Sequence, residues 1–486
     1  MSPEALDTLF KAPKNEDTGW YTLDKFGQKI WDAEKVRLFW KEFEDRKIQQ
    51  EDYIFDGFVF PVFRKKRNVY YFSSKLEFKK KVFFKNVTFV EAAHFSNVTQ
   101  FLDDVSMEFV NFQDELDFHG VRFFGSVYIG NTHIEKDVDF VSTQFKYLTL
   151  YNFTCNGDLD FRNARITESS TFSKVTLHKA FLLNTTSINE QFHIKQSVFN
   201  DLVSLKETTI LNDFHITNCN FTGTFNTVES RFGSLQLSDT IFDAQFKMLK
   251  CTLGFAIIED TIFDNFSLSQ LNFEEPTLYP VTIGFTNIDF PNKSKFERIN
   301  LTDITFNFCE LSTINFRNCI WNIKNRIILE EESLNLLDSE NHYRQLKSGF
   351  KSSNHWELSG NAYVSEMEMR KLRLYKEKRY VSWFIYWFYD KFGSYTQNFL
   401  RPLYIFLILS FFLFPLIYLL IDSALFAQFS LEQLSESYEK SIAAAFPFLK
   451  SDLLKDTNWW LKSFQVFFSG ILLTFFILAV RKRFKQ

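Results

Sequence analysis

The chain has 486 residues and a formal net charge of −4 at pH 7, so it is long enough for several domains and lacks the strong positive field of a nucleic-acid-binding protein. Phenylalanine contributes 63 residues, whereas glycine and proline contribute only 15 and 9, which sets the chain apart from average proteins. The five cysteines form no CxxC pair and stand at no metal-ligand spacing with histidine, so we expect buried, reduced thiols and no zinc site.

The N-terminal segment, residues 1–62, is interpreted as a helical cap. It lacks the apolar core after a basic start that marks a signal peptide. Residues 32–51 form an amphipathic pattern whose apolar side carries Val36, Phe39, Trp40 and Phe43. Because stacked strands leave an open edge that invites pairing, we assign this helix to a cap or a small subdomain, with partner binding as the alternative.

Residues 63–328 repeat one pattern many times. An apolar residue recurs at steps of ten or eleven: Ile166, Leu177, Ile188, Phe199, Ile210, Phe221, Phe232, Phe242, Leu253, Phe263 and Phe273. Two positions before these stands a side chain that is nearly always small, as at Ala164, Thr186, Thr208, Cys219 and Ser230. Residues two apart face the same way on an extended chain, and the sustained three- and four-residue spacing of a helix is absent. The pattern predicts a mainly β solenoid, in which about 250 residues at about 21 per coil form about twelve coils.

The motif of a small residue, a spacer and a large apolar residue is clearest in three tripeptides, Ala164-Arg165-Ile166, Cys219-Asn220-Phe221 and Thr240-Ile241-Phe242. It resembles the pentapeptide-repeat family. The resemblance implies a right-handed quadrilateral β-helix with about four pentapeptides per coil. This chain alternates steps of five and six residues, so we expect a wider corner or a bulge on alternate faces.

Residues 329–400 change in composition and are predicted to form a helical linker, with helices over 334–350 and 356–378 and an aromatic run at 383–389. The linker and the turn after it resemble the block that precedes the membrane spans of bacterial pentapeptide-repeat membrane proteins, although Phe392 stands where that block has tyrosine. The residues that carry this resemblance are Tyr343, Leu346, Lys347, Glu366, Arg370, Gly393, Arg401 and Pro402. Glu366 and Arg370 lie four apart on one helix, so we expect a supporting ion pair rather than a catalytic carboxylate.

Residues 401–486 contain two apolar stretches, 402–421 and 464–480, which we interpret as membrane-spanning helices. Basic residues precede the first stretch and follow the second, and the loop between them is acidic. The positive-inside rule then places both termini in the cytoplasm, and the resemblance implies the inner membrane of a bacterium.

The loop between the two stretches is the candidate pore region, because a short helix between two spans is the layout of a simple cation channel. The candidate pore-loop residues are Ser441, Ala445, Pro447 and Phe448. No glycine lies between Gly393 and Gly470, so the glycine-rich filter of a potassium channel is not supported. A less selective pore, a degenerate channel domain and a plain membrane anchor remain open.

We find no P-loop, GxGxxG, GxSxG or HExxH motif, so we expect no enzyme activity, cofactor or metal. The preferred hypothesis is a membrane protein whose cytoplasmic solenoid binds or senses a protein partner and whose two-helix module oligomerises into a pore, as in a stress or defence response. The first alternative is a membrane-tethered scaffold that conducts no ions. The second is a DNA-mimicking repeat protein that acts on a topoisomerase, which the mild acidity of the chain disfavours.

Overall fold

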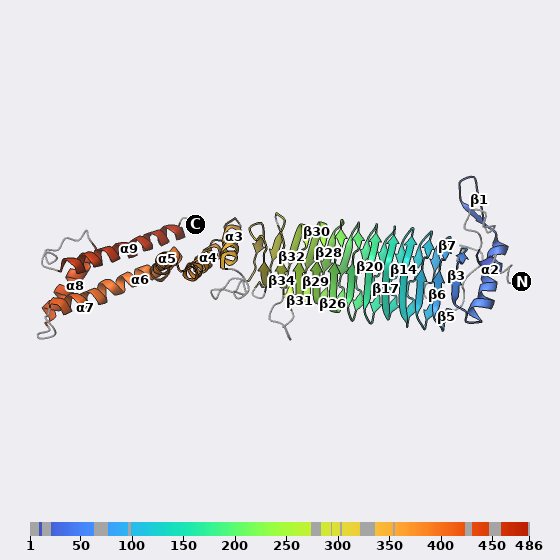
Figure 1. Ribbon diagram of the computed structural model, residues 1–486, viewed down its shortest axis with the longest axis horizontal. Coiled ribbons are helices and arrows are strands. Elements are labelled where there is room, and N and C mark those ends of the chain that lie inside the picture. Colours follow the sequence, from blue (N-terminus) through green and yellow to red (C-terminus); the bar gives the residue numbers. More distant parts are fainter. Residues whose placement is uncertain are drawn as a thin grey trace. The chain divides into compact units, whose positions relative to one another are not determined.

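The computed structural model describes residues 9–11, 21–62, 76–95, 99–273, 283–292, 294–301, 304–320, 336–352, 355–422, 430–446 and 458–484. The chain divides into two compact units, Met1–Asn322 and Ile323–Gln486. The first unit is a stack of parallel strands, and the second is built from helices (Figure 1).

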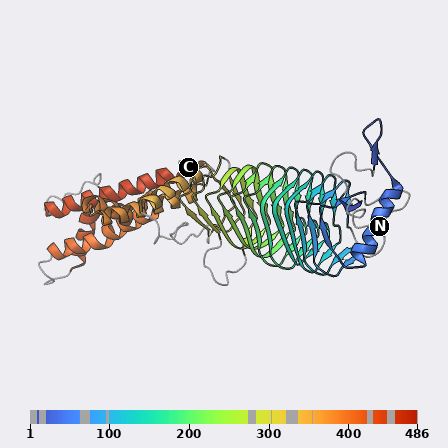
Figure 2. The same cartoon turned by 45° about the vertical axis from the view of Figure 1, so that its right-hand side comes forward.

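The first unit is a β-solenoid of about 10 turns over residues 77–317, and its coils stack face to face (Figure 2). Its strands are β3 (Ile54–Asp56), β4 (Val59–Phe60), β5 (Leu76–Phe78), β6 (Val82–Lys85), β7 (Thr88–Phe89), β8 (Ala93–His94), β9 (Thr99–Phe101), β10 (Val105–Glu108), β11 (Asn111–Phe112), β12 (Leu116–Asp117), β13 (Arg122–Phe123), β14 (Ser126–Ile134), β15 (Val138–Asp139), β16 (Gln144–Phe145), β17 (Tyr147–Cys155), β18 (Leu159–Asp160), β19 (Arg165–Ile166), β20 (Ser170–Leu177), β21 (Phe181–Leu182), β22 (Ser187–Ile188), β23 (Phe192–Lys195), β24 (Val198–Phe199), β25 (Val203–Lys206), β26 (Thr209–Thr217), β27 (Asn220–Phe221), β28 (Phe225–Val228), β29 (Arg231–Ser238), β30 (Ile241–Leu249), β31 (Thr252–Glu259), β32 (Ile262–Ser269), β33 (Asn272–Phe273), β34 (Ile283–Thr286), β35 (Lys295–Glu297), β36 (Ile304–Asn307) and β37 (Asn315–Arg317). One coil illustrates the arrangement, because β10 and β11 pair with the two halves of β14, while β12 pairs with β15 and β13 with β16, all parallel. Each such turn therefore has four short sides.

The apolar residues of the repeat point into the solenoid, as the spacing predicted. Ile188 pairs with Ile210 and Phe199 pairs with Phe221, and none of the four is more than 1% exposed. The rings of Phe199 and Phe221 stack at 4.7 Å, which is within the range that favours offset aromatic pairs. Residues 22 positions apart are the ones that stack, so the eleven-residue series forms two separate ladders.

Several of the small residues of the repeat form hydrogen bonds inside the solenoid, which explains why many of them are threonine or serine. The hydroxyl groups of Thr186, Thr208 and Ser230 donate to carbonyls about one coil earlier at 2.6, 2.5 and 2.7 Å. A short side chain with one donor fits here because a buried hydroxyl without a partner costs about 1–3 kcal/mol. Cysteines occupy equivalent places, and burial raises the pKa of the Cys219 thiol to about 11 and that of Cys309 to about 12.

The residue before each small residue adopts a left-handed backbone conformation. The φ angles are 58° at Asn163, 57° at Thr185, 55° at Glu207 and 54° at Asn218. This corner recurs along the solenoid at steps of ten as well as eleven residues, although the residues at these four corners are not glycine.

The solenoid has fewer turns than the about twelve expected, because its turns span residues 77–317 and one of its coils is longer than average. Ala256 pairs with Ile283, 27 residues later. An even division of the chain into coils of 21 residues therefore overestimates the number of turns.

The amphipathic helix expected over residues 32–51 is α2 (Ala33–Phe43), which continues as the π-helical segment η1 (Glu44–Ile48). Before it, β1 (Tyr21–Leu23) and β2 (Lys29–Trp31) form an antiparallel hairpin. Phe39 packs edge-on against Phe60 at 5.7 Å, and Trp40 Nε1 donates to the Val62 carbonyl at 3.1 Å. These contacts place the apolar side of α2 on β4 of the solenoid.

The second unit consists of α3 (Leu336–Ser352), α4 (Trp356–Lys376), α5 (Tyr380–Gly393), the short 3-10 segment η2 (Ser394–Thr396), α6 (Leu400–Ile408), the π-helical segment η3 (Leu409–Leu413), α7 (Phe414–Asp422), α8 (Leu431–Ala445) and α9 (Trp459–Phe484). The first apolar stretch is α6, η3 and α7 in succession, and the second lies within α9. Two helices, Leu400–Ile421 and Trp459–Lys482, are long and apolar enough to cross a membrane.

Candidate functional site

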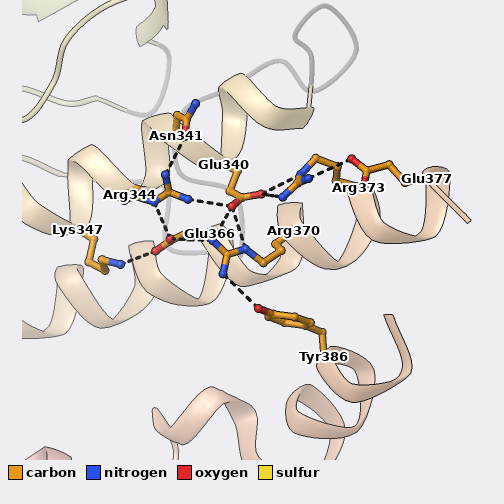
Figure 3. Close-up of polar contacts among 9 residues, drawn as sticks. All are labelled: Glu340, Asn341, Arg344, Lys347, Glu366, Arg370, Arg373, Glu377 and Tyr386. Carbon is orange, nitrogen blue, oxygen red and sulfur yellow. Dashed lines mark hydrogen bonds and ion pairs between the residues drawn. The ribbon is translucent and has the colours of Figure 1, made fainter. Parts of the chain in front are cut away.

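Two buried carboxylates lie between α3 and α4 (Figure 3). Glu340 comes from α3 and Glu366 from α4, and their side chains are 2% and 3% exposed. Four cations of the same two helices surround them: Arg344, Lys347, Arg370 and Arg373. We call these six residues the α3–α4 charge cluster.

Glu340 is the centre of this cluster. Arg370 donates through Nε and Nη2 at 2.9 and 2.7 Å, Arg373 through the same atoms at 3.1 and 3.0 Å, and Arg344 through Nη2 at 2.9 Å. Burial alone would raise the pKa of Glu340, but the hydrogen bonds from Arg370 and Arg373 outweigh it, so the pKa lies below its ordinary value. Glu340 is therefore an ionised anchor for the helices.

Glu366 accepts hydrogen bonds from Lys347 Nζ at 2.6 Å and Arg344 Nε at 3.1 Å. Arg370, the partner expected from the four-residue spacing, lies 3.9 Å from Glu366 and gives its shorter contacts to Glu340. Arg370 Nη1 also donates to the Tyr386 hydroxyl at 3.2 Å, which adds α5 to the network. Charged groups that are paired this closely hold the two helices together, and they are poorly suited to act as general acids or bases.

The other residues that carry the resemblance to the membrane-protein block contribute to packing within the helical unit. Tyr343 and Leu346 are buried on α3, and Pro402 is buried in the first turn of α6, where Arg401 is half-buried. Gly393 is buried at the end of α5, and a Cβ atom there would lie 3.1 Å from Phe475 of α9. The absence of a side chain at Gly393 thus lets α5 approach α9.

A second polar cluster lies among the apolar helices, and we call it the η3–α9 polar cluster. It consists of Ser410 on η3, Ser441 on α8 and Gln465 on α9, all fully buried. Ser441 Oγ donates to the Ser410 carbonyl at 2.7 Å. Gln465 Nε2 donates to the Ser441 carbonyl at 2.8 Å and to its Oγ at 3.0 Å. Ser410 lies in a π-helical turn, a deviation that often marks functional sites.

The contacts of α8 fix its direction between the apolar helices. Ser441 lies beside Ser410 and Gln465, whereas Ala445 packs against Phe406 and Leu472. From Ser441 to Ala445, the contact on the first apolar helix passes from Ser410 to the earlier residue Phe406, and the contact on the second passes from Gln465 to the later residue Leu472. Helix α8 therefore runs antiparallel to the first apolar helix and parallel to the second. It ends beside Leu472, near the middle of Trp459–Lys482.

The structure thus places Ser441 of the candidate pore loop in the polar cluster and Ala445 in apolar contact with Phe406 and Leu472, whereas Pro447 and Phe448 lie outside the described residues. Sequence reasoning missed Glu340 and Gln465. The available signals were a carboxylate four positions before Arg344 on an expected helix and an amide within an apolar stretch, where polar residues are costly and often functional.

Within the described part of the chain, no group of three or more histidine, cysteine, aspartate or glutamate side chains is arranged to bind a metal. Comparison with known proteins adds no relative, since no family model, curated protein or solved structure matches the chain.

Proposed function

We propose that the protein is an integral membrane protein of a bacterial inner membrane, with pentapeptide-like repeats, whose solenoid binds a protein partner and whose helical unit oligomerises into a cation-conducting pore. Both termini and the solenoid are cytoplasmic in this proposal, because the basic residues flank the apolar helices.

The exposed apolar side chains of the helical unit support insertion into lipid. Only 33% and 22% of the two apolar windows are buried, far less than in the core helix of a soluble protein. Phe412 and Phe467, for example, are 70% and 67% exposed. Large apolar side chains that are exposed on two such helices are expected to contact lipid acyl chains.

The observation that best supports a pore is the position at which α8 ends. Its last turn lies beside Leu472, which is about 15 Å from the basic end of α9 at a rise of about 1.5 Å per residue. A helix that ends inside the membrane leaves backbone there, and such backbone is tolerated only where protein buries it or where it lines a water-filled cavity. The carbonyl end also carries about half a negative charge, so several copies that converge around an axis would favour cations.

The solenoid supports the partner-binding half of the proposal through the regularity of its outer surface. Outward side chains lie in rows across successive coils, as in the stacked pair His193 and His215, whose rings are 4.7 Å apart. Rows of this kind give stacked-repeat proteins extended binding surfaces.

The test is ion flux through liposomes that contain the purified full-length chain, together with its mass in detergent. We expect an oligomer that passes potassium and sodium but little chloride. Ile442→Lys, which places a cation on the half-buried side of the last turn of α8, is expected to reduce the cation flux at least tenfold, whereas Ile442→Ser is expected to leave it near the native value. The mass of each variant shows whether it still assembles.

A protein that inserts into liposomes but stays monomeric and passes no ions would contradict the pore. That result would favour the scaffold, and partners retained by the full chain but lost on deleting residues 70–325 would then define its role.

A further inference from the structure

A cavity of about 440 Å³ lies in the helical unit where α4 begins, η2 ends and α9 reaches its basic end. Its walls include Trp356 and Glu357 of α4, Gln397 after η2, and Lys482 of α9. Ala479, one turn before Lys482, also lines it, so the cavity adjoins the last apolar turn of α9. None of these residues belongs to the charge cluster or the polar cluster.

Lys482 is the cation of this cavity. Its Nζ lies 4.4 Å from the centre of the Tyr363 ring, and it forms no ion pair with any residue that the structure describes. Lys347 lies over the same ring at 5.2 Å but is neutralised by Glu366, with which it pairs at 2.6 Å. Lys482 is therefore partly buried and still free to bind an anion.

The opposite charge is present in the same cavity without being joined to Lys482. Glu357 is exposed in the first turn of α4 and likewise forms no ion pair within the described ranges. Trp356 lies next to it in the chain and also lines the cavity, and an aromatic face attracts ammonium groups. The cavity thus offers separate places for a positive and a negative group.

Gln397 adds a hydrogen-bonding side chain. Its Nε2 is buried and has no acceptor among the described residues, although a buried amide normally has one. Gly360 makes room for it, since a Cβ atom at that position would lie 2.6 Å from Gln397 Oε1. The amide can therefore donate to an anion that Lys482 attracts.

We propose that this cavity binds the head group of a zwitterionic phospholipid, an aminoethyl phosphodiester, whose phosphate is bound by Lys482 and Gln397 and whose ammonium is bound by Glu357 and Trp356. The inference rests on the proposed membrane insertion, which brings the basic end of α9 to the level of lipid head groups. Ile477 and Leu478, the exposed apolar residues one turn earlier, lie where the acyl chains would run. A purely anionic head group fits less well, because Glu357 repels it.

The experiment measures lipid binding to the full-length protein in detergent by native mass spectrometry. Short-chain phosphatidylethanolamine, phosphatidylglycerol and the soluble ester glycerophosphoethanolamine are titrated separately. We expect the zwitterionic lipid to bind about tenfold more tightly than the anionic lipid, and the soluble ester to bind much more weakly because it lacks acyl chains. Equal binding of the soluble ester and the lipid would overturn the lipid assignment.

Two variants test the charges. Lys482→Met is expected to weaken binding of both lipids about tenfold, whereas Glu357→Gln is expected to weaken the zwitterionic lipid and strengthen the anionic one, which reverses the preference. Lys376→Met, on α4 but outside the cavity, is the matched control. Unchanged affinity for both lipids in Lys482→Met, or an unchanged preference in Glu357→Gln, would refute the proposal, and Gln397→Leu, which should also weaken binding of both lipids, tests it if either variant misfolds.

Flotation of the same protein with liposomes separates this inference from the proposed function. A protein that floats with the liposomes but shows no lipid preference refutes the head-group site and leaves membrane insertion intact. A protein that does not float refutes both.

Discussion

Glu340 shows how much of a helical junction can depend on one side chain. Its two carboxylate oxygens accept hydrogen bonds from Arg344 of α3 and from Arg370 and Arg373 of α4, so it joins α3 to one turn of α4. Without the carboxylate, three guanidinium groups would face one another across a partly buried space. Electrostatic repulsion would then replace attraction at the same point.

We expect Glu340→Gln to destabilise the helical unit by about 3 kcal/mol, because removing one partner of a buried pair leaves the other charges uncompensated. The measurement is thermal unfolding of the full chain in detergent. Glu377→Gln is the control, since Glu377 is 40% exposed and contacts Arg373 at the edge of the cluster. Equal unfolding temperatures for both variants would show that Glu340 does not anchor the helices.

The low pKa of Glu340 also predicts a pH dependence. Its folded-state pKa lies below the ordinary glutamate value of about 4.3, so its contribution to stability is fully present above that value and is lost as the pH falls through the folded-state pKa. We therefore expect the unfolding temperature of the helical unit to drop as the pH falls below the ordinary glutamate pKa of about 4.3. The drop should be smaller in Glu340→Gln, and an identical drop would assign the effect to other groups.

At the scale of elements, the solenoid corner and the buried helix α8 place different demands on sequence. The corner needs a left-handed residue every ten or eleven positions, and asparagine, which tolerates that conformation, occupies several of them, including Asn131, Asn152, Asn163 and Asn218. The corner is thus encoded locally, residue by residue.

Asn218→Val is expected to lower the free energy of unfolding by about 1–2 kcal/mol, because a β-branched residue strongly disfavours a φ of 54°. Asn218→Gly is expected to stay within about 0.5 kcal/mol of the native protein, since glycine adopts this conformation without strain but loses more entropy on folding. Denaturant unfolding of the full chain measures both. A valine variant as stable as the glycine variant would mean that the corner is not strained.

The packing of α8 depends instead on one amide from another helix. Gln465→Leu removes two hydrogen bonds to Ser441, and we expect it to lower stability by about 1 kcal/mol and to alter ion flux in liposomes. Thr474→Val is the matched control, because among the described residues the Thr474 hydroxyl bonds only to the Gly470 carbonyl of its own helix. The same flux in both variants would argue against a role for Gln465 in positioning α8.

These differences explain what the sequence could reveal. The inward positions of Ile188 and Phe199 were predictable because a side chain's direction on a strand depends only on its place in the repeat. The anchoring role of Glu340 was not, since its partner Arg370 is 30 residues away and no periodicity links two helices. The depth at which α8 ends was also not predictable, because it is set by contacts with Phe406 and Leu472 on other helices.

At the scale of the whole molecule, nearly equal coils imply that the solenoid tolerates changes of length. Phe199 and Phe221 occupy the same place in successive coils, as do Val198 and Asn220. Removing one complete coil joins chain ends that already have matching directions, and each remaining coil keeps two neighbours.

We expect deletion of residues 199–220 to leave the full chain folded, with a strand-rich circular dichroism spectrum and cooperative unfolding. Deletion of residues 199–217 is the control, because it shifts the following strands by three positions and turns their inward side chains outward. That control should aggregate or unfold. If both deletions unfold the protein, neighbouring coils are less equivalent than their register indicates.

The backbone hydrogen bonds of the solenoid join each coil to the next, so they lie in series along the stack. Tension applied along that direction would load every interface equally and open the weakest first, one coil at a time. A coil of 22 residues that peels away frees about 70 Å of extended chain. The solenoid would therefore behave as an extensible tether that lengthens in discrete steps and relieves mechanical strain before it reaches the rest of the protein.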